Sequence, residues 1–135
     1  MLHRQIIPLA VLSLAVALIG CGRSQPPADA AVGRRVADAF LEQVRAGQLD
    51  AAWKSTTAEF KSDEGRESFI RDVKSKPFLR QPLAFVNYEV TNLNGLTRAQ
   101  CIYESTAGKQ SPAARLRIIV AQDAGEWRVD GILVE

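Results

Sequence analysis

The strongest constraint on the fold is a change in the spacing of apolar residues at Pro82. Before this proline, apolar residues recur three or four positions apart, as they do on one face of a helix. After it, they alternate with polar residues, as they do in half-buried strands. This segregation predicts an α+β domain in which N-terminal helices pack on one face of a curved, four-stranded antiparallel sheet.

The first half of the chain contains several helix boundaries. A regular apolar face predicts a helix over residues 30–46, and Gly47 lies where a left-handed residue commonly ends a helix. Asp50 is placed to cap a short second helix, and Thr57 to open a further turn. Another apolar pattern predicts a last helical stretch over about 64–75.

The second half contains the turns and irregularities of an antiparallel meander. Asn94 and Gly95 are the residue types that a two-residue hairpin requires, because both positions need positive φ. The sequence DAGE predicts a second hairpin near the end of the chain. In the last strand the apolar phase shifts around Gly131, which predicts a β-bulge there.

The N-terminus has the features of an export signal. Residues from Ile6 to Ile19 are apolar except for Ser13, and Arg4 precedes them. This run is shorter than the ~20 residues that span a bilayer, and it matches the apolar centre of a secretory signal. We therefore expect residues 1–20 to be removed.

The residues at the end of this run, Leu18-Ile19-Gly20-Cys21, resemble the lipobox of bacterial lipoproteins. The resemblance implies cleavage between Gly20 and Cys21 and acylation of Cys21, which would then bind membrane lipid. Residues 21–31 would be the lipidated cysteine and its tether. The protein would be anchored in the bacterial cell envelope, on the outer side of the cytoplasmic membrane or at the outer membrane. The alternative is an ordinary signal followed by an incidental cysteine.

Composition limits the chemistry of the remaining chain. The formal net charge is +2, from 17 basic and 15 acidic residues, so the basic excess of a nucleic-acid-binding protein is missing. The single histidine, His3, lies in the predicted signal. With Cys21 acylated, Cys101 has no partner for an intrachain disulfide, and we expect it to be a small buried hydrophobe. Neither a metal site nor a cofactor is predicted.

Two segments, VADAFLEQVRAGQLDAAWKSTTAEF and WRVDGILVE, resemble small NTF2-like (cystatin-like) exported domains. The resemblance covers residues 32–135 and implies a sheet that curls around the helices into a cone with an apolar cavity. The family includes isomerases, dehydratases, polyketide cyclases, transport factors and interaction modules. The His–Asp pair of the dehydratases is missing here. The isomerases use an aspartate with a tyrosine. In this chain, alternation along the strands places Asp130 and Glu89 on the other face of the sheet from Tyr88.

A set of large side chains is predicted to face the helices. These residues either line an apolar pocket, with phenol hydroxyls that orient a ligand, or fill the core of a small domain. The candidate pocket residues are Trp53, Phe60, Tyr88, Cys101, Tyr103 and Trp127.

The opposite face of the sheet combines arginines with apolar residues. It is either a solvated face held by ion pairs or a surface for a second copy or an envelope partner. The candidate dimer face comprises Phe85, Arg98, Ile102, Arg117 and Ile119. The leading hypothesis is therefore a membrane-anchored, non-catalytic interaction module that binds a second copy of itself, as a homodimer, or an envelope protein. The alternatives are a binder of an apolar small molecule in the cone and an isomerase-type enzyme.

Overall fold

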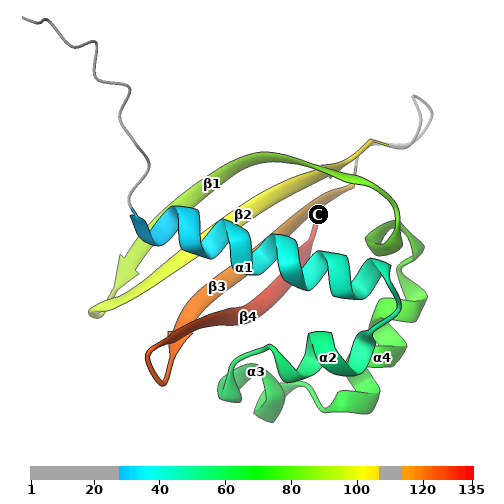
Figure 1. The fold of residues 1–135 in the computed structure, drawn as a ribbon, viewed down its shortest axis with the longest axis horizontal. Coiled ribbons are helices and arrows are strands. Elements are labelled where there is room, and N and C mark those ends of the chain that lie inside the picture. The colour runs from blue at the N-terminus through cyan, green and yellow to red at the C-terminus, as the bar shows by residue number, and fades with distance from the viewer. Residues whose placement is uncertain (1–27, 107–113) are drawn as a thin grey trace, which may run out of the picture.

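A computed structural model describes residues 28–106 and 114–135 (Figure 1). The predicted signal, Cys21 and residues 21–27 of the predicted tether lie outside the described residues. In order, the elements are α1 (Ala28–Arg45), α2 (Leu49–Lys54), α3 (Ala58–Asp63), α4 (Arg66–Ser75), the 3-10 helix η1 (Pro77–Arg80), β1 (Leu83–Leu93), β2 (Leu96–Ser105), β3 (Arg115–Asp123) and β4 (Glu126–Val134). The predicted α+β class is confirmed. None of the helices in these ranges is long and apolar enough to cross a membrane.

The four strands form an antiparallel sheet in the order β1-β2-β3-β4, which is the predicted meander. Both predicted tight turns are present. Asn94 and Gly95 have φ of 53° and 78°, and Ala124 and Gly125 have φ of 50° and 82°. These values fit two-residue hairpins whose twist matches that of the strands.

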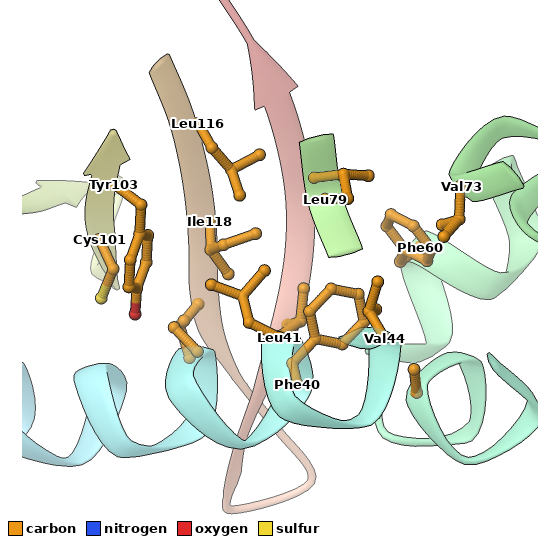
Figure 2. Close-up of a cluster of buried hydrophobic side chains, with 14 of the residues drawn as sticks. Phe40, Leu41, Val44, Phe60, Val73, Leu79, Cys101, Tyr103, Leu116 and Ile118 are labelled. Carbon is orange, nitrogen blue, oxygen red and sulfur yellow. The ribbon is translucent and has the colours of Figure 1, made fainter. Parts of the chain in front are cut away.

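Helix α1 lies across one face of the sheet, called here the inner face (Figure 1). Its apolar side contributes Phe40, Leu41 and Val44 to the core, where they meet inward-facing residues of β2 and β3 (Figure 2). The helix sits close to β2 because it carries a glycine at the contact. A Cβ on Gly33 would lie 2.9 Å from the Cβ of Ala99.

The short helices follow the predicted boundaries with one exception. Thr57 caps α3, since its hydroxyl accepts a hydrogen bond from the Phe60 amide at 3.1 Å. Asp50, however, does not cap α2, because the N-cap position is Gln48. Asp50 instead forms a hydrogen-bonded ion pair with Arg66. Helices α2, α3 and α4 gather on the β4 side of the domain (Figure 1).

Two β-bulges set which side chains share a face. The bulge predicted near Gly131 is confirmed, because Val129 and Gly131 pair with adjacent residues of β3 and Asp130 is the extra residue. A second bulge, between Phe85 and Asn87, was not predicted. It shifts the phase of β1, so Phe85 lies opposite Tyr103 on the inner face. The assignment of Phe85 to the opposite, outer face was therefore wrong.

Candidate functional site

Most of the candidate pocket residues are part of the core. Phe60, Cys101 and Tyr103 have exposed fractions of 7%, 0% and 3%, and they pack with the apolar side of α1 (Figure 2). Trp53 and Trp127 are partly buried against the same cluster. These five side chains thus contribute to filling the interior. The sixth, Tyr88, is half-buried on β1, opposite Cys101.

The polar end of Tyr103 is held by a residue that the sequence analysis did not single out. Its hydroxyl donates a hydrogen bond to Asp38 Oδ1 at 2.6 Å. Asp38 also pairs with Arg34, with 3.6 Å between Nε and Oδ2, and the Arg34 guanidinium lies 3.9 Å from the centre of the Phe85 ring. The spacing of Arg34 and Asp38 is typical of an ion pair on a helix and is visible in the sequence. The hydrogen bond from Tyr103 to Asp38 is not, because it forms only when β2 and α1 are docked.

This arrangement keeps the Tyr103 hydroxyl and the Cys101 thiol protonated. Two causes raise the pKa of Tyr103 well above its usual range: burial is the larger, and the hydrogen bond to Asp38 is the next. Burial also raises the pKa of the Cys101 thiol to about 11. An isomerase-type tyrosine must direct its proton at a substrate, whereas the Tyr103 proton is directed at Asp38. A protonated, fully buried thiol is likewise a poor nucleophile.

The outer face of the sheet carries a row of arginines that pair within the chain. Arg117 lies 2.9 Å from Glu135 and 3.8 Å from Glu89. Arg115 pairs with Glu104 at 2.9 Å. Opposite charges at neighbouring positions of adjacent strands stabilise a sheet face, and here they leave the face nearly balanced in charge.

The apolar residues of the outer face differ in how far they are covered. Ile102 is buried, with an exposed fraction of 5%, whereas Leu133 is 51% exposed. Ile119 is half-buried and lies over Gly131, where an added Cβ would be 3.1 Å from its Cδ1 atom. Of the predicted dimer face, Arg98, Ile102, Arg117 and Ile119 thus share the outer face.

A polar cleft of about 210 Å³ lies where α3 meets the ends of β2, β3 and β4. Thr57 donates a hydrogen bond to Asp130 Oδ1 at 2.7 Å, and Asp130 Oδ2 lies 3.5 Å from Arg98. The Asp130 side chain is only 9% exposed. Asp123 accepts a hydrogen bond from the Ala58 amide at 2.7 Å. These partners join α3 to the sheet.

A larger groove of about 570 Å³ follows β4 on the side of α3 and α4. Acidic side chains line its helical wall, and the pKa of one of them, Glu64, is raised by burial and by the neighbouring carboxylate of Asp72. Ile132 and Leu133 line its sheet wall. No cluster of three or more potential metal ligands occurs within residues 28–106 and 114–135.

Comparison with known proteins supports the fold without giving an activity. No family model and no curated protein matches the sequence. A protein from Catenulispora acidiphila, whose structure was solved at 2.5 Å, is similar in fold, with a TM-score of 0.54. The match covers 78% of this chain and 88% of that one, at 14% sequence identity. At this identity the similarity is one of fold: helices packed on a four-stranded antiparallel sheet.

Proposed function

We propose that this chain is a lipid-anchored envelope protein whose NTF2-like domain is a non-catalytic interaction module that self-associates through the outer face of its sheet. The observation that supports this most directly is the uncovered outer face. Among the described residues, α1 is the helix that packs extensively on β1, β2 and β3, and it does so on the inner face. The outer face of these strands is therefore left to solvent or to a partner.

The composition of that face suits a second copy of the chain. A two-fold interface brings the same surface of both subunits together, so the surface must be complementary to itself. Paired charges such as Arg115 with Glu104 and Arg117 with Glu135 place both signs on one face. Leu133 adds exposed apolar area beside them. Two such faces can exchange ion-pair partners across the interface while burying the apolar residues.

The lipid anchor rests on the Leu18–Cys21 pattern and on the short connection to the domain. Helix α1 begins at Ala28, so seven Cα steps separate Cys21 from the folded part. At 3.3–3.6 Å per residue the connection can reach at most about 25 Å. A domain tied this closely would meet its partners at the membrane surface. Mass spectrometry of the chain from its host should show the acyl chains on Cys21, and Cys21→Ser should release the protein from the membrane fraction.

Self-association is tested by sedimentation of the full chain in density-matched detergent over a concentration series. The parent should change from monomer to dimer, and Leu133→Glu should shift this change to at least tenfold higher concentration. The new carboxylate would be desolvated in the interface, and its cross-strand neighbour Arg117 is already paired with Glu135 and Glu89. Val90→Glu is the matched control, since Val90 is 40% exposed but lies on the inner-face side of β1. A parent that stays monomeric throughout the series would refute the dimer. If the mass of the native protein instead exceeds that of the chain, and the excess is lost on denaturation, a bound small molecule would be favoured over self-association.

A further inference from the structure

Strand β4 has an open edge along its second half. The strand order places β4 at one side of the sheet. Its first half is covered, because Thr56 bridges Val129 and the Thr57 amide donates to the Val129 carbonyl at 2.8 Å. From Gly131 to Val134, the part of the chain that the structure describes supplies no further backbone partner on that side. An unpaired strand edge is a template for an added strand.

The hydrogen bonds to β3 show which groups this edge offers. Arg115 and Glu135 exchange both backbone hydrogen bonds, at 3.1 and 2.8 Å. In an antiparallel pair, hydrogen-bonded positions alternate with positions whose N–H and C=O point away from the partner. By this alternation Leu133 bonds inward to β3. Ile132 and Val134 direct their N–H and C=O groups towards the open edge.

The groove beside this edge is apolar on one wall and acidic on the other. Ile132 and Leu133 lie on the sheet wall, and the helical wall carries carboxylates of α3 and α4. These acidic residues are Glu59 and Asp63 of α3, Glu64 directly after α3, and Asp72 of α4. Arg98 is the basic residue among the described lining residues, and it is already paired with Asp130. The groove therefore favours a positively charged occupant.

We propose that this groove binds an extended segment of another protein, one that carries both basic and apolar side chains and that pairs with the backbone of Ile132 and Val134 as a fifth strand. The backbone hydrogen bonds would fix the segment along β4. Basic side chains would meet the carboxylates of α3 and α4, and apolar ones would cover Leu133. This site shares Leu133 with the surface proposed above for self-association, but each proposal has its own test, peptide binding here and the oligomeric state there.

A second copy of this chain fits the groove less well than a basic segment. Pairing β4 with β4 across a two-fold axis would bring two acidic walls towards each other, and like charges that face one another are destabilising. The other free edge, β1, has the sequence LAFVNYEVTNL, which contains Glu89 and no basic residue. Charge therefore selects a partner of different sequence.

The proposal is tested with the full chain and a short peptide of alternating lysine and valine. Its control is the same peptide with glutamate in place of lysine. We expect only the basic peptide to bind, and amide hydrogen exchange should then slow at Ile132 and Val134, whose N–H groups point outward. Exchange at Leu133 should change little, because that amide already bonds to β3. Sedimentation of the same samples records the oligomeric state independently.

Two variants separate backbone pairing from charge. Val134→Pro removes an N–H that the described fold does not use, so the protein should stay folded while binding weakens at least tenfold. Glu59→Gln combined with Asp63→Asn should weaken binding about threefold for each charge, whereas Glu67→Gln, on α4 outside the groove, should change nothing. The proposal is overturned if neither peptide binds, if both bind equally, if protection falls on β1, or if Val134→Pro binds as tightly as the parent.

Discussion

The packing of α1 on β2 at Gly33 makes a specific prediction for Gly33→Ala. In an exposed helix, replacing glycine with alanine stabilises by about 1 kcal/mol. Gly33 is buried, however, and the new Cβ would lie 2.9 Å from the Cβ of Ala99 and 4.0 Å from that of Val120. A Cβ cannot rotate away from a contact, so α1 or β2 must move. Overpacking of this kind costs about 1–3 kcal/mol, and we expect a net loss of about 1 kcal/mol.

The contact itself can be isolated with a double-mutant cycle. Ala99→Gly alone should destabilise by about 1 kcal/mol, since it weakens a strand and removes a buried methyl group. In the presence of Gly33→Ala the same change should be neutral or favourable, because it frees the space that the new methyl needs. The expected coupling is about 1–2 kcal/mol in favour of the double variant.

Urea denaturation followed by the fluorescence of Trp53 and Trp127 measures all four free energies of unfolding. Both tryptophans are partly buried against the core, so their emission should change on unfolding. An increase of about 1 kcal/mol in the free energy of unfolding for Gly33→Ala would show that helix propensity outweighs the steric cost of the contact. Additive effects of the two substitutions would show that the residues do not touch. Either result would refute the close packing of α1 on β2.

Three further predictions concern a turn, a cap and a buried thiol. Ala124 has a φ of 50°, which is unfavourable for alanine and tolerated by asparagine, so Ala124→Asn should raise the free energy of unfolding by about 0.5–1 kcal/mol in urea melts. Thr57→Val should lower it by about 2 kcal/mol, because the Phe60 amide loses its cap and the nearly buried Asp130 loses a donor; an unchanged melt would contradict this role. Burial raises the pKa of Cys101 from 9.0 to about 11, so the folded state holds that proton more tightly and stability should fall as pH rises from about 9 to 11. Melts at several pH values should show this fall. Cys101→Ala should remove it between about pH 9 and 10, whereas above this range the raised pKa of Tyr103 adds a fall of its own that the substitution leaves in place.

Local chemistry made several elements predictable from the sequence. Asn94 and Gly95 specify a tight turn through their tolerance of positive φ, and Thr57 specifies a helix start through its hydroxyl. Each feature depends on a few adjacent residues. The change of apolar period at Pro82 predicted the fold class for a similar reason, since periodicity records which face of each element is buried.

Features that depend on register could not be predicted in the same way. The bulge between Phe85 and Asn87 has no glycine or other marker, yet it moves Phe85 to the inner face. The contact between Tyr103 and Asp38 joins residues 65 positions apart and exists only once α1 and β2 are docked. The acidic groove likewise combines α3, α4 and β4. The spacing of apolar residues identified the helices and strands. The site depends instead on the register of the strands and on how the helices pack against them.

The bulge in β4 shows how one residue determines the surfaces of this domain. Because Asp130 is an extra residue, Val129 and Ile132 both pack on the core although they are three positions apart. The carboxylate of Asp130 then reaches Thr57 and Arg98, which ties α3 to the sheet and closes the first half of the β4 edge. Beyond the bulge, residues 28–106 and 114–135 supply no further backbone partner on this side of β4, and the open edge begins at Gly131. The same irregularity that holds α3 in place therefore leaves the groove along the rest of β4 available.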